Sequence, residues 1–199
     1  MTQSCKMPTV TIFGSSLPVE GSSAYADARK VGRLCAEFGF AVCNGGYGGL
    51  MEASARGARE AGGVAIGVTC EIWTSPANQW ISLQVRTRTY LERIMTLIER
   101  GDAYFVLPGG TGTLAELALV WEMMNKSMLS GSLGGRKPLL VWAPYWQPVI
   151  ECLNQETHLG ARSAPSFDRQ ARAMEIITLV NDADQAAEKL REVLTRLSG

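Results

Sequence analysis

Residues 103–116 have the sequence AYFVLPGGTGTLAE, and this stretch decides the fold. The apolar run Ala103–Leu107 predicts a buried strand, and the glycine-rich loop after it runs directly into an expected helix that reaches about Met128. Free backbone N–H groups and the positive end of the helix dipole then face any anion beyond the strand. Because Thr111 and Thr113 add hydroxyl donors, the stretch predicts a phosphate-binding site.

The same strand–loop–helix unit occurs twice nearer the N-terminus. Thr9–Phe13 predicts a strand that stops at Gly14, and apolar residues at spacings of three and four then predict a helix that ends at Gly39. Phe40–Cys43 leads in the same way into the glycine-rich segment Asn44–Gly49. The remaining expected elements are a helix at 50–61, a strand at 64–68, a short strand at 81–85, a helix at 90–98, a strand at 139–142, a helix near 146–156, a strand at 176–180 and a closing helix over 183–197.

This order of elements predicts the fold class. Strands that alternate with helices require right-handed crossovers, which build a mostly parallel sheet with helices on both faces. The chain is therefore expected to be α/β, Rossmann-like and doubly wound. A length of 199 residues suits one core, so we expect a single nucleotide-binding domain over residues 1–199.

Composition and charge disfavour several classes of partner. The 19 Lys and Arg residues balance 19 Asp and Glu residues, so no chain-wide positive field favours nucleic acid. No apolar run approaches the ~20 residues of a membrane span, and the first six residues lack the apolar core of a signal peptide, which predicts a cytoplasmic protein without membrane contact. Cysteines without a CxxC pair and a single histidine, His158, predict neither a metal site nor a bound cofactor.

Candidate site residues follow from the positions of the glycine-rich loops. In a doubly wound sheet, ligands bind beyond the carboxyl ends of the strands. The chain lacks the GxxxxGK[ST] pattern of ATP-binding P-loops, and the GxGxxA pattern at Gly110 is not followed by an acidic residue after the strand at 139–142, which disfavours a dinucleotide. Three loops leave strand ends, and they supply the expected substrate-binding residues Ser15, Ser16, Gly45, Gly46, Gly109, Gly110, Thr111, Gly112 and Thr113.

Two charged residues near the third loop are candidates for catalysis. Glu116 lies about one turn into the following helix, where a carboxylate either complements the helix dipole or stabilises positive charge on a ribosyl group. Arg93, on the preceding expected helix, is either the partner of Glu116 or a solvated surface charge. Trp73 and Trp80 leave a similar alternative open, since two indoles either stack on a purine or anchor their proline-containing loop.

The segment Leu107–Glu116 resembles the PGGxGTxxE signature of the LOG (Lonely Guy) proteins, a family formerly labelled lysine decarboxylases. The segments FGSS at 13–16 and GGYGGLM at 45–51 resemble the same family. The resemblance implies a Rossmann-like homodimer, or an assembly of dimers, that hydrolyses a nucleoside 5′-monophosphate to free base and ribose 5-phosphate. The implied substrate is a cytokinin riboside monophosphate or its simpler analogue AMP. Met123 and Met124 suit either the core or such a subunit interface.

The resemblance also implies roles for the two charged residues. Glu116 matches the catalytic glutamate of the family, and Arg93 matches the arginine of its RKxxM segment. The chain departs from that segment with Ile94 in place of lysine and Leu97 in place of methionine. These departures keep a second hypothesis open, a nucleotide or molybdenum-cofactor carrier of the same fold without turnover. The decarboxylase label fits poorly, because pyridoxal phosphate needs a lysine and none lies in the three loops.

Overall fold

The computed structural model describes residues 7–129, 137–155 and 176–198, so His158 lies outside the described residues. Its elements are β1 (Thr9–Phe13), α1 (Ser23–Glu37), β2 (Ala41–Asn44), α2 (Leu50–Glu60), β3 (Ala65–Cys70), β4 (Leu83–Thr87), α3 (Tyr90–Arg100), β5 (Ala103–Val106), α4 (Thr111–Asn125), β6 (Leu139–Trp142), α5 (Ala143–Asn154), β7 (Ile177–Val180) and α7 (Ala183–Ser198). The strands form one sheet in the order β4-β3-β2-β1-β5-β6-β7, and every neighbouring pair is parallel.

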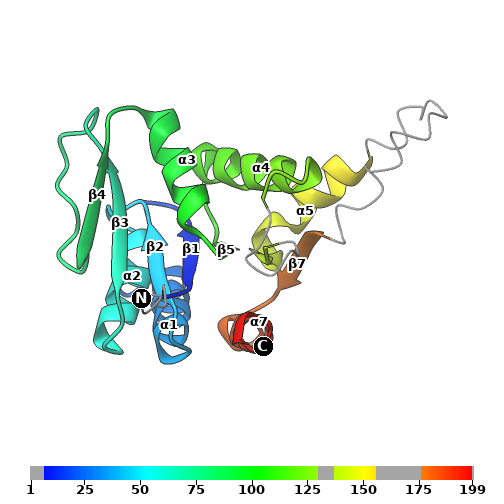
Figure 1. The fold of residues 1–199 in the computed structure, drawn as a ribbon, viewed down its shortest axis with the longest axis horizontal. Helices are drawn as coiled ribbons and strands as arrows, with labels where there is room; N and C mark the ends of the chain where they lie inside the picture. Colours follow the sequence, from blue (N-terminus) through cyan, green and yellow to red (C-terminus); the bar gives the residue numbers. More distant parts are fainter. Residues whose placement is uncertain (1–6, 130–136, 156–175, 199) are drawn as a thin grey trace, which may run out of the picture.

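Helices cover both faces of this sheet. Figure 1 shows α1, α2 and α7 on one face and α3, α4 and α5 on the other. Every residue of β1, β2, β5 and β6 is buried, including the polar residues Thr9, Thr11 and Asn44, so these strands have no exposed face. Only the edge strand β4 is largely exposed among the strands described. The structure thus confirms the doubly wound, Rossmann-like α/β fold.

The helix after the glycine-rich loop is shorter than expected. α4 ends at Asn125 rather than near Met128, and Ser127 then turns the chain with a φ of 56°. Met123 and Met124 are buried and belong to the core, whereas Met128 is 65% exposed. The methionines of this region therefore divide between the interior and the surface.

Two further boundaries differ from the sequence prediction. α5 begins at Ala143, directly after β6, rather than near Trp146. Pro144 explains this early start, because a proline in the first turn of a helix lacks only an N–H group that would have no helical partner. The short strand expected at 81–85 is present as β4, shifted to Leu83–Thr87.

Two glycines allow α1 and α2 to pack with their backbones in contact. A Cβ atom on Gly32 would overlap the carbonyl oxygen of Ser54, and one on Gly57 would overlap that of Arg29. Glycine is required where backbones approach this closely. The contact fixes α2, whose first residue follows the second glycine-rich loop.

The order of the strands defines where a ligand crevice lies. β2 lies on one side of β1 and β5 on the other, so the direction of winding reverses between β1 and β5. Because the strands are parallel, the loops that follow β1, β2 and β5 leave the same edge of the sheet. In the part of the chain that the structure describes, no helix has the length and apolar character needed to cross a membrane.

Candidate active site

The three predicted loops meet at one cavity of about 670 Å³ beyond the carboxyl ends of β1, β2 and β5. Gly46 and Gly109 lie beside the cavity but not in its lining. The predicted residues that line it are Ser15, Ser16, Gly45, Arg93, Gly110, Thr111, Gly112, Thr113 and Glu116. Residues from distant parts of the chain are thus brought together at the crevice that the strand order defines.

Hydrogen bonds join the first loop to the other two. The backbone N–H of Ser15 donates to the carbonyl of Pro108 at 3.0 Å, and the N–H of Leu50 donates to the carbonyl of Ser15 at 2.8 Å. Gly49 has a φ of 69°, and a Cβ atom there would overlap the backbone of Ser15 and Ser16. Glycine is therefore needed at this position for the first and second loops to touch.

The third loop presents the beginning of α4 to the cavity. Gly110 is the N-cap residue, and no side chain caps the helix there. The first N–H groups of a helix have no partners within it, so this end suits an anion. The side chain of Thr113 packs directly against Gly109, where a Cβ atom would overlap it. Gly109 therefore shapes the loop, while Gly110 and Thr111 line the cavity.

Two aromatic side chains of α5 donate hydrogen bonds to backbone carbonyls at the third loop. The hydroxyl of Tyr145 donates to the carbonyl of Gly109 at 2.8 Å, and the indole Nε1–H of Trp146 donates to the carbonyl of Leu107 at 2.9 Å. Both bonds use carbonyl oxygens, so they leave the loop's N–H groups available to a ligand. No local pattern in the sequence indicates this support, because α5 contacts the loop only in the tertiary structure.

Arg93 is buried in the cavity wall rather than solvated, with only 5% of its surface exposed. Its Nε–H donates to the carbonyl of Val68 at 2.8 Å. Its guanidinium carbon lies 5.1 Å from the ring centroid of Trp73 and 5.7 Å from that of Tyr47, within the range of cation–π attraction. A Cβ atom on Gly45 would overlap the guanidinium group, so Arg93 also packs flush against the second loop. The surface-charge alternative is therefore wrong.

Glu116 projects from α4 to the same point and is 8% exposed. Its Oε1 lies 3.8 Å from Nη1 of Arg93, an ion pair that is too long to be a direct hydrogen bond. Burial raises the pKa of the Glu116 carboxyl to about 7, although the positive charge of Arg93 acts to lower it. The carboxylate accepts no hydrogen bond from the residues that the structure describes. It is therefore available to a ligand hydroxyl or a water molecule.

The described residues contain no group of three or more histidine, cysteine or acidic side chains that could hold a metal ion. The charged side chains that line the cavity, among the described residues, are those of Arg93 and Glu116. A buried carboxylate with a raised pKa in a cleft is a common property of catalytic acids and bases.

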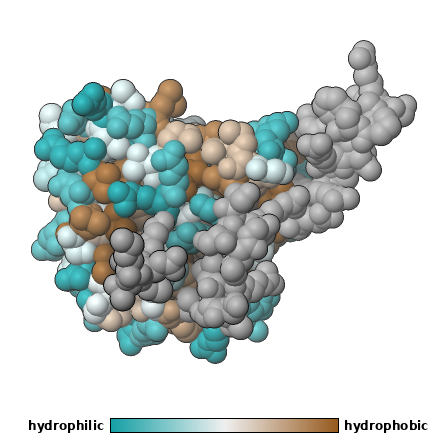
Figure 2. Space-filling model, viewed as in Figure 1, coloured by the Kyte–Doolittle hydropathy of each residue, from teal (hydrophilic) through white to brown (hydrophobic). Residues whose placement is uncertain are grey.

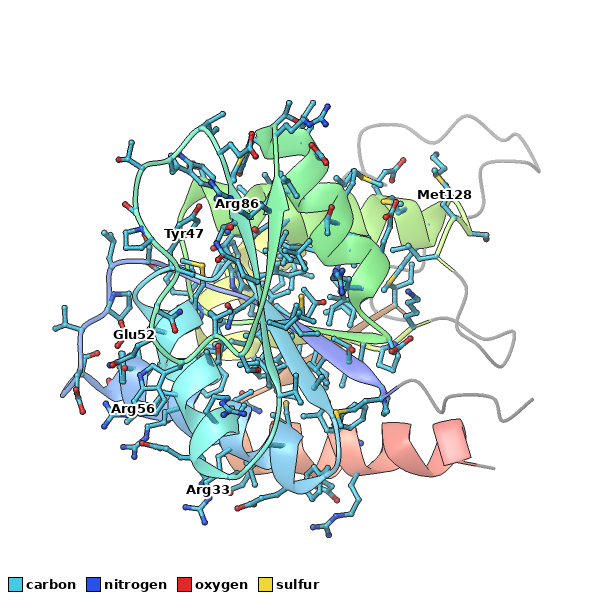
Figure 3. All side chains as sticks on the ribbon, turned by 60° about the vertical axis from the view of Figure 1, so that its left-hand side comes forward. Arg33, Tyr47, Glu52, Arg56, Arg86 and Met128 are labelled. Atoms are coloured by element: carbon cyan, nitrogen blue, oxygen red, sulfur yellow. The ribbon has the colours of Figure 1, made fainter. Side chains whose placement is uncertain are left out.

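The aromatic part of the cavity was only partly anticipated. Tyr47 and Tyr90 both line it, and Tyr47 was open to prediction because it lies within the second glycine-rich loop. Figure 3 shows Tyr47 beside the connection between β3 and β4. Trp73 lines the cavity from that connection, whereas Trp80 is absent from the lining and lies under the guanidinium of Arg56 at 5.3 Å. The two tryptophans thus occupy different environments.

Comparison with known proteins supports the resemblance seen in the motifs. A family model described as the SLOG cluster4 family matches residues 7–136. The chain is 32% identical over 141 residues to the cytokinin riboside 5′-monophosphate phosphoribohydrolase of Mycobacterium tuberculosis, with 69% of this chain and 71% of that protein covered. It is also 35% identical over 95 residues to an uncharacterized protein of Archaeoglobus fulgidus. That alignment covers 48% of this chain and 62% of the relative, so the chain spans less than two thirds of the relative's length.

Solved structures show the same fold. The molybdenum cofactor carrier protein of Chlamydomonas reinhardtii has a TM-score of 0.71 and 19% identity, with 96% of this chain and 99% of that chain covered. At this identity the likeness concerns the fold and not the activity. The family model, in contrast, spans more than half of the chain and includes all three glycine-rich loops. The chain therefore belongs to the SLOG cluster4 family of LOG-type proteins, which confirms the predicted resemblance to the LOG family.

Proposed function

We propose that this chain is a phosphoribohydrolase that cleaves the N-glycosidic bond of a nucleoside 5′-monophosphate, with AMP or a cytokinin riboside monophosphate as substrate. The proposal rests on one observation, the buried pair of Arg93 and Glu116 at a cavity that the beginning of α4 also lines. A carboxylate that merely complemented a helix dipole would need no buried arginine beside it. The relative from Mycobacterium tuberculosis, which is named for this activity, supports the proposal.

The shape of the site suits a nucleoside monophosphate. A volume of about 670 Å³ lies within the usual range of small-molecule sites. We expect the phosphate to bind the N–H groups of Gly110–Thr113, where the helix dipole is also favourable. Glu116 lies one helical turn further along α4, so a phosphate held there places the ribose near the carboxylate. The base then extends toward the aromatic part of the cavity.

In the proposed reaction, the oxygen of a water molecule bonds to C1′ of the ribose as the bond from C1′ to the base nitrogen breaks. The base leaves with the electron pair of that bond and takes up a proton that derives from the water. Positive charge develops on the ribosyl group during this step, and the ionised carboxylate of Glu116 stabilises it and orients the water. Arg93 favours this ionised form, because its positive charge opposes the effect of burial on the pKa of Glu116.

The proposal is tested by incubating the purified chain with AMP and quantifying adenine and ribose 5-phosphate by chromatography. We expect the two products in equal amounts, and we expect none from the Glu116→Gln variant on the same timescale. Binding of AMP without any release of free base, either adenine from AMP or the cytokinin base from a cytokinin nucleotide, would instead indicate the carrier hypothesis that Ile94 keeps open. The same assay thus separates an enzyme from a binding protein.

We also propose that the protein is a homodimer that pairs through the outer side of α3 and α4. Leu91 on α3 is 71% exposed and Met128 just beyond α4 is 65% exposed. Figure 2 shows brown and tan surface gathered over the region where Figure 1 draws α4. Exposed apolar patches of this kind are typical of subunit interfaces.

A charged substitution tests the proposed interface. Ala118 is exposed in the middle of α4, and we expect Ala118→Arg to convert a dimer into a monomer in light scattering at micromolar concentration. Ala26→Arg is the matched control, because Ala26 is equally an exposed helical alanine but lies on α1, on the other face of the sheet. A monomeric parent protein, or a dimer that survives Ala118→Arg, would contradict the proposed interface.

A further inference from the structure

The connection between β3 and β4 contains two tryptophans that lie in different surroundings. Trp73 lines the cavity with Ser75 and Pro76 of the same connection. Trp80, seven residues later, does not line the cavity, and its ring centroid lies 5.3 Å from the guanidinium carbon of Arg56. The indole of Trp73 is therefore available to a ligand in the cavity. The indole of Trp80 is not, so a substitution of Trp80 can serve as a control for a substitution of Trp73.

The ring of Trp73 is held in a fixed position at the cavity. Its centroid lies 5.5 Å from that of Tyr47 at an interplanar angle of 87°, and 5.8 Å from that of Tyr90 at 72°. Both contacts are edge-to-face, and the guanidinium carbon of Arg93 lies 5.1 Å from the same ring. These three neighbours restrain the indole before any ligand binds, which lowers the entropic cost of a contact with it.

Trp73 nevertheless keeps 40% of its surface exposed. A large aromatic ring usually buries its apolar surface, so a restrained and half-open indole inside a cavity offers surface for a flat ligand. The same cavity is lined at another part by the uncapped beginning of α4, which suits an anion. A ligand that uses both features carries a phosphate and an aromatic ring.

We infer that Trp73 is a specificity-determining residue that stacks on the base of the bound nucleotide and favours a purine over a pyrimidine. The inference rests on the proposed nucleotide site but not on turnover at that site. Base–aromatic stacking is driven by contact area, so the two-ring purine gains more from an indole than a single-ring pyrimidine does. Ribose 5-phosphate, which has no base, gains nothing from Trp73.

An alternative role for Trp73 is to shield Arg93 from water, since the two groups are in contact. The two roles differ in what they do to a ligand without a base. Loss of a shield changes the environment of Arg93 and affects every ligand of the site to a similar extent. Loss of a stacking surface weakens only ligands that carry a base.

The experiment measures the dissociation constants of AMP, CMP and ribose 5-phosphate by isothermal titration calorimetry. The measurements use the full chain with Glu116→Gln, which the proposed mechanism leaves able to bind nucleotide without consuming it. The variants compared in this background are Trp73→Leu, Trp73→Phe and Trp80→Leu. Trp73 is half-exposed, so its substitution leaves the core intact, and a thermal melt of each variant verifies folding.

We expect AMP to bind about tenfold or more tightly than ribose 5-phosphate, with CMP in between. Trp73→Leu should remove most of this difference while leaving the affinity for ribose 5-phosphate within about twofold, and Trp73→Phe should retain part of it. Trp80→Leu should leave the difference unchanged. If Trp73→Leu weakens AMP and ribose 5-phosphate equally, or if AMP keeps its advantage without the indole, the inference is overturned.

The outcome of this experiment is independent of the proposed activity. Release of adenine by the chain with intact Glu116 tests the phosphoribohydrolase proposal alone. Binding of AMP that depends on Trp73, without release of free base from AMP or from a cytokinin nucleotide, would support the inference and refute the hydrolase. Release of adenine together with Trp73-independent binding would do the reverse.

Discussion

Replacement of Glu116 by glutamine should make the protein more stable and inactive at the same time. The amide has the shape of the protonated acid but never ionises, so it removes the free-energy cost of a buried carboxylate. The pKa of Glu116 is about 7 in the folded chain against an ordinary value of 4.5, a gap that corresponds to about 3 kcal/mol at pH 8. At pH 5 the folded chain still holds the proton, and although most unfolded chains have already lost theirs, the pH is only slightly above the unfolded pKa, so the gain falls to about 1 kcal/mol.

The sign of this effect follows from which state binds the proton more tightly. The folded chain keeps the Glu116 proton up to about pH 7, whereas the unfolded chain loses it near pH 4.5. Rising pH between these values therefore destabilises the parent protein through this group and leaves the glutamine variant unaffected. Loss of an electrostatic stabiliser of the transition state should lower kcat on AMP by on the order of 10²-fold or more.

Urea unfolding followed by tryptophan fluorescence at pH 5 and pH 8 measures the stability difference directly. Glu122→Gln is the matched control, because Glu122 lies on the same helix but is 55% exposed and pairs with Lys126 at the surface. We expect this control to change the free energy of unfolding by less than about 0.5 kcal/mol at either pH and to keep full activity. If Glu116→Gln shows the same stability as the parent at pH 8 and hydrolyses AMP at the parent rate, the assigned burial and role of this carboxylate are both refuted.

Two further predictions concern groups that position the site. Tyr145→Phe removes one hydrogen bond to the carbonyl of Gly109. We therefore expect the KM for AMP to rise about fivefold while kcat stays within about twofold of the parent value. An unchanged KM would show that this bond does not shape the glycine-rich loop before α4. In the parent, kcat should rise with pH around 7 as Glu116 ionises, and Arg93→Gln should move this rise to higher pH because the arginine acts to lower the pKa of Glu116. A pH profile of kcat in which the rise stays in place would argue against coupling between the two side chains.

The sequence was sufficient for the fold and for one part of the site. Strands buried on both faces have no exposed polar face, and the β-branched run Thr9–Phe13 and the apolar run Ala103–Leu107 predict such strands without any structure. A glycine-rich loop that enters a helix leaves the first N–H groups of the helix without helical partners through local backbone geometry, so the uncapped beginning of α4 at Gly110 could also be predicted. Less regular segments were harder, because the boundaries of α5 and β4 depend on one proline and on pairing at an edge.

The environment of each charged or aromatic side chain was decided by the tertiary structure. Arg93 looked equally suited to solvent, since charged neighbours surround it in the sequence, and only its packing against Val68, Tyr47 and Gly45 shows that it is buried. Trp73 could not be distinguished from Trp80, the other tryptophan of its loop, for the same reason. Burial and the resulting pKa of a carboxyl depend on atoms that four separate elements bring together, and no local pattern in the chain specifies that arrangement. The sequence by itself thus determined the scaffold and the glycine-rich loop that enters α4, while tertiary packing determined which side chains line the cavity.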